Sequence, residues 1–214
     1  MTTLRPPLLV LMSSAVEDKA TPAPSVAVDQ IEACRRGDRG ALDAVFRAHA
    51  DGLARLLTRI IGPKADVEDL LQETFAAAIT AFPKFRGEAS VKTWLHRIAI
   101  HVAQQDLRRP RHRREVELEN ADEEASTAEL PPERRELARL LYAHLDALDA
   151  TKRITLVLYV IEEHTVEEIA ALLGASKAAT RSRILWARRK LMKRLRRDPA
   201  FAGVELELRG GGEP

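Results

Sequence analysis

Cysteine, aromatic residues and long apolar runs are all scarce in this chain of 214 residues. Its single cysteine, Cys34, excludes an intramolecular disulfide, makes a zinc finger implausible and fits a reducing compartment. The apolar run 8–12 is too short to span a bilayer, and no convincing signal-peptide cleavage site follows it. We therefore expect a cytoplasmic protein that does not insert into a membrane.

Strand patterns and catalytic motifs are also missing. No segment alternates apolar and polar residues as a half-buried strand does. The sequence contains no glycine-rich phosphate loop and no nucleophile constellation, and the acids around His164 do not have the H-E-x-x-H spacing of a zinc protease. We predict a protein that is not an enzyme and that needs no cofactor or metal, in which His164 flanks a helix cap.

Charge is abundant but locally segregated. Charged residues make up 31% of the chain and nearly cancel, to a net charge of +2. Residues 108–114 hold five arginines and no acid, 115–129 hold seven acids and no base, and 181–197 hold nine Lys or Arg and no acid. Any binding of nucleic acid must therefore come from these local blocks rather than from the total charge.

Helical periodicity divides the chain into two parts. Prolines and small residues mark residues 1–27 as an N-terminal arm, and 113–134 read as an acidic linker. The periodic segments 28–112 and 135–200 predict an all-α protein of two small helical bundles, followed by a tail at 201–214. A flexible linker of this length can reach on the order of 70 Å, so the two bundles need not touch.

The second bundle contains the pattern of a helix-turn-helix. Thr165 and Glu168 form a T-x-x-E capping box, Gly174 ends that short helix, and Ser176 can cap a longer basic helix. A helix dipole explains basic residues late in this helix, but it disfavours cations in the first two turns. The pattern therefore favours duplex DNA binding. The candidate residues are Lys177, Arg181, Ser182, Arg183, Trp186 and Arg188.

The first bundle contains aromatic residues interleaved with cations. The stretch "VKTWLHRIAIHVAQQDLRR" carries an apolar stripe on one helix face and a hydrogen-bonding stripe on another. Stacking rings beside cations suit unpaired bases. The alternative is an amphipathic helix with a solvated basic side, in which Phe82 and Trp94 are ordinary core residues. The candidate DNA contacts are Phe85, Arg86, Lys92, Trp94, Arg97, His101, Gln104 and Arg108.

Two long segments resemble a known family. The segment "DVEDLLQETFAAAITAFPKFRGEASVKTWLHRIAIHVAQQDLRR" is similar to the second conserved region of the extracytoplasmic-function (ECF) sigma factors of bacterial RNA polymerase. The segment "LDATKRITLVLYVIEEHTVEEIAALLGASKAATRSRILWARRKLMKRL" is similar to their fourth region. With the helices that precede them, the two matches cover roughly residues 28–197.

This resemblance implies a transcription initiation factor. It implies that the first bundle melts and reads the -10 promoter element, that the second reads the -35 element, and that an anti-sigma factor is a partner. It also implies binding to the clamp helices of the largest subunit of core RNA polymerase. The residues implied in that contact are Asp66, Glu68, Asp69, Leu70, Gln72 and Glu73.

The chain departs from the family pattern at two places. Many relatives carry Asn at the position of His101, which is associated with the -10 base pocket. The usual G-T-V before the arginine of the recognition helix is Ala178-Ala179-Thr180 here. Base preference at both promoter elements is therefore open.

A conventional helix-turn-helix regulator that binds duplex DNA without polymerase is the alternative function. That hypothesis explains the second bundle but leaves the aromatic and basic residues of the first without a role. Promoter-dependent transcription with core polymerase separates the two functions.

Overall fold

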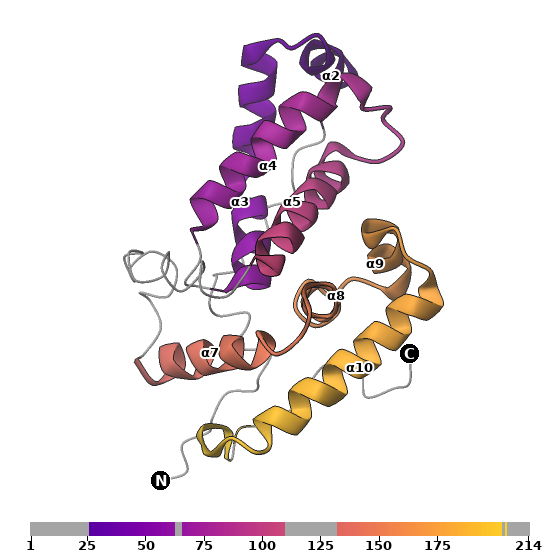
Figure 1. The fold of residues 1–214 in the computed structure, drawn as a ribbon. Coiled ribbons are helices and arrows are strands. Elements are labelled where there is room, and N and C mark those ends of the chain that lie inside the picture. Colours follow the sequence, from indigo (N-terminus) through magenta and orange to yellow (C-terminus); the bar gives the residue numbers. More distant parts are fainter. Residues whose placement is uncertain (1–25, 63–65, 110–131, 203, 205–214) are drawn as a thin grey trace.

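A computed structural model describes residues 26–62, 66–109, 132–202 and 204, and its helices form two domains (Figure 1). The first domain consists of α2 (Val28–Arg35), α3 (Arg39–Ile61), α4 (Val67–Ala81), η1 (Phe82–Lys84) and α5 (Val91–Arg108). The second consists of α7 (Pro132–Leu145), α8 (Ala150–Val160), α9 (Val166–Leu173), α10 (Lys177–Leu195) and η2 (Pro199–Phe201). Across the described residues all regular structure is helical, which confirms the predicted fold class.

The described helices start with α2 at Val28 and resume with α7 after the segment that the structure does not describe. This helix begins at Pro132, so the end of the predicted linker, 132–134, is helical. The remainder of the linker, most of the N-terminal arm and most of the C-terminal tail lie outside the described residues.

Local capping chemistry fixes where most helices begin. The Asp66 carboxylate accepts a hydrogen bond from the backbone N–H of Asp69 at 3.1 Å, and Ser176 caps α10 through the N–H of Ala179 at 3.2 Å. Thr165 and Glu168 form the predicted reciprocal capping box of α9. Gly174 ends α9 in the left-handed conformation, with φ at 59°, which glycine adopts without the strain other residues incur.

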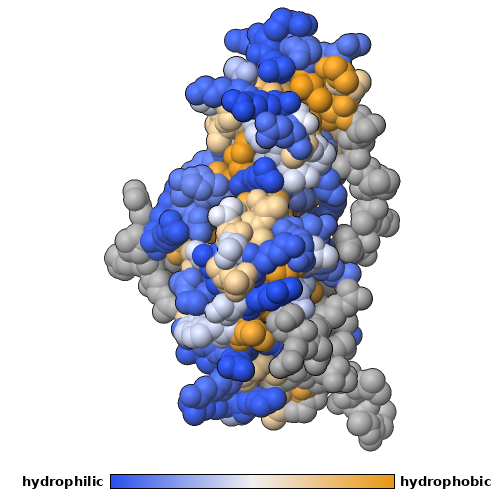
Figure 2. Space-filling model, turned by 90° about the vertical axis from the view of Figure 1, so that its right-hand side faces the viewer, coloured by the Kyte–Doolittle hydropathy of each residue, from blue (hydrophilic) through white to orange (hydrophobic). Residues whose placement is uncertain are grey.

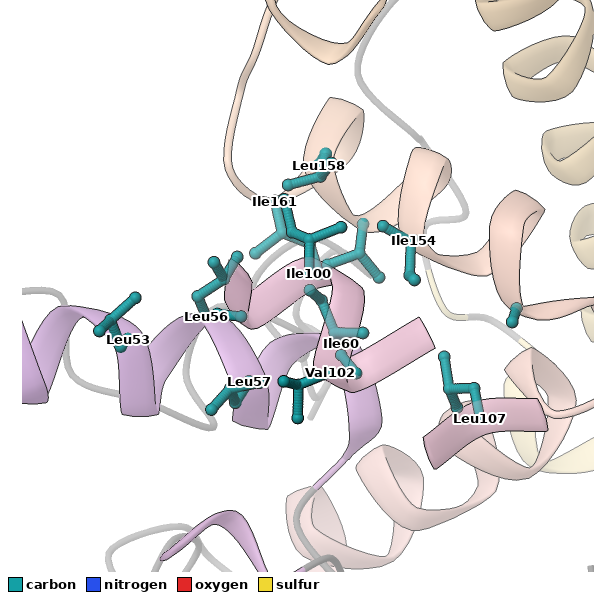
Figure 3. Close-up of a cluster of buried hydrophobic side chains, with 14 of the residues drawn as sticks. Leu53, Leu56, Leu57, Ile60, Ile100, Val102, Leu107, Ile154, Leu158 and Ile161 are labelled. Carbon is teal, nitrogen blue, oxygen red and sulfur yellow. The ribbon is translucent and has the colours of Figure 1, made fainter. Parts of the chain in front are cut away.

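A continuous apolar core runs through both domains. The long helix α3 presents Leu53, Leu56, Leu57 and Ile60 to α5, whose Leu95 and Val102 are buried. The helix α8 contacts α3 and α5 on one side and α10 on the other (Figure 1). Figure 3 shows Ile154, Leu158 and Ile161, from α8 and its end, beside Ile60 and Ile100 of the first domain. The two domains therefore pack directly against each other.

Candidate nucleic-acid interface

The helix-turn-helix is formed by α9, a short turn and α10. Ile169 and Ala170 of α9 and Thr180 and Ile184 of α10 are buried between the elements of the second domain. The backbone N–H of Ala175 donates to the carbonyl of Ala170 at 2.9 Å, which tightens the turn. Both helices are therefore held rigidly, and the first turns of α10 are left at the surface.

The predicted duplex contacts lie on that surface. Lys177, Arg181 and Ser182 are exposed, and Arg183 is half-buried. The ammonium of Lys177 lies 3.0 Å from the Glu167 carboxylate, and the resulting hydrogen bond lowers the pKa of Glu167. The ion pair connects α9 to the start of α10 across the turn. Glu167 therefore holds Lys177, one of the side chains predicted to contact DNA, close to α9.

Trp186 lies further along α10 and is 46% exposed. Its ring is flanked by the ammonium groups of Lys152, 4.1 Å from the ring centroid, and Lys190, at 5.0 Å. These cation–π contacts fix the indole at the surface beside two positive charges. Lys152 belongs to α8. The sequence pattern did not identify it as part of this surface, because only the fold brings it next to Trp186.

The candidate single-strand contacts follow α5 and the loop before it. Lys92, Arg97, His101 and Arg108 are exposed on α5, and Trp94 and Gln104 are half-buried. The side chain of Arg86 is 82% exposed and lies 3.9 Å from Glu88. Most of the predicted stripe is therefore available to a ligand.

Phe85 is the exception, because it lies in the core. Phe85 is 6% exposed, and its ring packs with those of Phe82 and Trp94, at centroid distances of 5.7 Å and 5.0 Å. This burial favours a packing role over the predicted direct contact. Phe82 is completely buried, as expected of a core residue.

His101 has a partner that sequence reasoning missed. Its Nε2 lies 2.8 Å from Nε2 of Gln105, one helical turn later. Gln104 instead donates to the hydroxyl of Thr151 in α8 at 2.9 Å. The i to i+4 spacing from His101 would have singled out Gln105.

Two further histidines, His96 of α5 and His49 of α3, are at least partly buried. Burial lowers the pKa of His96 to about 4, and the nearby Lys92, His164 and His49 add to the effect. Burial and Lys92 also lower the pKa of His49, whose Nε2 is buried and has no hydrogen-bond partner among the described residues. Both imidazoles are therefore neutral at pH 7.

The predicted polymerase contacts gather on one face of α4. Asp66, Glu68, Asp69, Gln72 and Glu73 are exposed at or just after its N-terminal cap. Leu70 is only 4% exposed and belongs to the core, so its position does not support the predicted direct contact. The large apolar residue exposed on this helix is Ile79, which is 51% exposed. One of these acids already has a partner within the chain: the Nη2 of Arg109 lies 3.3 Å from Oε1 of Glu73.

The face of the molecule in Figure 2 is mostly hydrophilic, and apolar residues form small separate patches on it. Among the described residues, no helix combines the length and apolarity needed to cross a bilayer. The described part of the chain also holds no group of three or more His, Cys, Asp or Glu side chains suited to a metal ion.

Comparison with known proteins decides the family. Residues 45–114 match the family model of sigma-70 region 2, and residues 138–191 match that of sigma-70 region 4. The chain is 31% identical over 169 residues to the ECF RNA polymerase sigma-E factor of Escherichia coli K12, covering 74% of this chain and 88% of that protein. The chain belongs to the ECF sigma factors.

Further relatives agree with this assignment. The sigma-E factor of Haemophilus influenzae is 28% identical over 177 residues, which cover 77% of this chain and 93% of that protein. The structure of CnrH in complex with the cytosolic domain of CnrY matches with a TM-score of 0.55 at 28% identity, over 79% of this chain and 97% of that chain.

A second solved structure shares the fold. It is the sigma factor RpoE of Bartonella quintana in complex with the anti-sigma factor NepR, with a TM-score of 0.50 at 23% identity, over 76% of this chain and 99% of that chain. The region 2 match runs from within α3 through α5, and the region 4 match runs from within α7 into α10, so the first domain contains region 2 and the second contains region 4. This ECF sigma factor is an RNA polymerase-binding promoter-specificity factor, and the conventional regulator is not favoured.

Proposed function

We propose that region 2 of this sigma factor melts and reads the -10 element through α5, and that region 4 reads the -35 element as duplex through α10. The observation that carries the proposal is the exposed cationic row on each helix, in regions that match the family in the expected order. Arginine suits bidentate contact with guanine, whereas Lys and Ser more often hold backbone phosphates.

The single-strand role rests on α5. Arg97 and His101 are exposed on one side of the helix, and Trp94 exposes part of its indole beside them. A base that leaves the stack can lie against this aromatic edge while the cations hold the phosphates. Phe82 and Phe85 support Trp94 from behind.

We further propose that the acidic face of α4 binds the clamp helices of the polymerase's largest subunit. Exposed carboxylates at the start of α4, followed by Gln72 and the apolar Ile79, suit a basic helix with an apolar seam. The proposal places the protein in the cytoplasm, where core polymerase is found. An anti-sigma factor is a further proposed partner, because a relative has been solved with one.

The deciding experiment is promoter-dependent transcription with purified core polymerase and the full chain. Initiation that requires both the chain and a cognate promoter supports the proposal. Duplex binding by the free protein without any effect on initiation would favour a conventional regulator. Arg181→Ala tests the -35 helix, and Arg194→Ala, an exposed arginine late in the same helix, is the matched control.

A further inference from the structure

The C-terminal end of α3 in region 2 is capped by a side chain from region 4. Arg153 of α8 is 1% exposed, and its Nε donates to the carbonyl of Ile60 at 2.7 Å while Nη2 donates to that of Ile61. Its Nη1 donates to the carboxylate of Asp146. The last carbonyls of a helix have no partner within the helix, and a cation there complements the helix dipole. The guanidinium satisfies both needs across the domain boundary.

Tyr142 of α7 closes the same corner. Its hydroxyl donates to the carbonyl of Arg59 at 3.1 Å, and its ring lies against Gly62. A Cβ at Gly62 would come within 2.8 Å of that ring, and φ at this position is +105°. Glycine is therefore required here both for the backbone conformation and for the close approach of region 4.

A buried ion pair and apolar contacts extend this interface. The Nη1 of Arg59 in α3 lies 2.8 Å from Oε1 of Glu162, just after α8, and the two side chains are 7% and 15% exposed. Ile60 and Ile100 meet Ile154 and Leu158 in the same cluster (Figure 3). Buried charges that lose their partners are costly, so the interface is specific for this arrangement.

The closed arrangement conflicts with simultaneous reading of both promoter elements. The -10 and -35 elements are separated by about 25 base pairs, which at about 3.4 Å each span roughly 85 Å. In the structure α9 contacts both α5 and α10, so the two reading helices are separated by only one helix layer, with at most about 20 Å between their axes. Gln104 on the reading face of α5 is also engaged by Thr151 of region 4.

We propose that the free sigma factor rests in this closed state, in which region 4 binds the end of α3 in cis, and that promoter recognition requires the Arg153 and Tyr142 contacts to break. This inference rests on the proposed function, because it assumes that α5 and α10 read separate elements. The apparent affinity for core polymerase and promoter DNA equals the affinity of the open form multiplied by the fraction of molecules that are open, so the closed state weakens binding.

The test measures the distance between fluorophores on the full chain at Arg47→Cys and Arg189→Cys, two exposed positions on α3 and α10. Arg153→Met keeps much of the side-chain volume and removes every donor, Tyr142→Phe removes only the hydroxyl, and Arg135→Met on the exposed side of α7 is the control. Unchanged far-UV circular dichroism verifies that each variant is folded. We expect a short distance in the parent and control, and a longer one in both interface variants.

Binding to core polymerase with promoter DNA gives the functional readout. In the interface variants a larger fraction of the molecules is open. Their apparent Kd should therefore fall by about tenfold or more. A long distance in the parent, or folded interface variants whose distance and Kd equal those of the control, would overturn the closed state. Failure of the parent to support promoter-dependent transcription would instead overturn the proposed function. The distance between the fluorophores does not depend on transcription, so the two failures can be told apart.

Discussion

The ring of Phe82 meets the indole of Trp94 edge to face, with 4.9 Å between the ring centroids. Phe82 is fully buried and Trp94 is half-exposed, so the contact ties a surface side chain of α5 to the core and restricts the motion of the indole. Edge-to-face pairs contribute about 0.5 to 1.5 kcal/mol beyond the area they bury. The aromatic cluster therefore holds in place the ring we assign to the -10 base.

Replacing Phe85 separates packing from DNA contact. Phe85→Leu keeps an apolar side chain in the cluster, so we expect a loss of roughly 1 kcal/mol in unfolding free energy and promoter melting within about threefold of the parent. Denaturant unfolding and permanganate reactivity of the opened promoter measure the two effects. A collapse of melting at unchanged stability would show that the Phe85 ring contacts DNA directly.

Arginines in the first turns of α10 should read bases. Arg181→Ala and Arg183→Ala should each weaken use of the cognate -35 element by about 1 to 3 kcal/mol, because a bidentate contact with a base edge is lost. Transcription from promoters with single -35 substitutions measures this loss. If each variant reduces transcription by the same factor on every -35 sequence, the side chains bind phosphates instead.

The acidic face of α4 should determine affinity for core polymerase. Replacing Glu68 and Asp69 together with Lys should weaken core binding by roughly tenfold or more, because like charges would then face the partner, and added salt should reduce the difference. Competition for fluorescent core polymerase measures the affinity. Glu133→Lys, at an exposed acid of α7, is the control, and an equal loss there would point to a general charge effect.

Stability should fall in acid because His96 is neutral in the folded chain. The unfolded chain takes up this proton near pH 6.5, whereas the folded chain does so only at about 4. Between these values the unfolded state binds more protons, so the unfolding free energy decreases as the pH falls, by at most about 3 kcal/mol. Urea unfolding from pH 7 to 4 measures the slope. His96→Gln should flatten it, and an unchanged slope would assign the acid sensitivity to other groups.

Helix starts and ends were predictable from sequence because they depend on near neighbours. Asp66, Thr165 and Ser176 cap residues three positions away, and Gly174 ends α9 at the expected place. The interface between the domains was not predictable. Arg153 reaches a carbonyl 93 residues away, and in the sequence it resembles any arginine on a helix. Periodicity likewise could not place Ile79 at the surface, since nothing nearby in the sequence shows which apolar face a neighbouring helix leaves uncovered.

His101 should influence which base is accepted in the -10 element. It is exposed on α5, at a position where the family resemblance implies Asn, and its Nε2 pairs with Gln105. An imidazole nitrogen and a carboxamide offer different donor and acceptor patterns, so His101→Asn should shift the preferred base at one -10 position. Gln105→Ala, which leaves the imidazole in place but removes its partner, should give a smaller shift in the same position. Transcription from a library of -10 variants measures both, and an unchanged preference in His101→Asn would remove His101 from the reading surface.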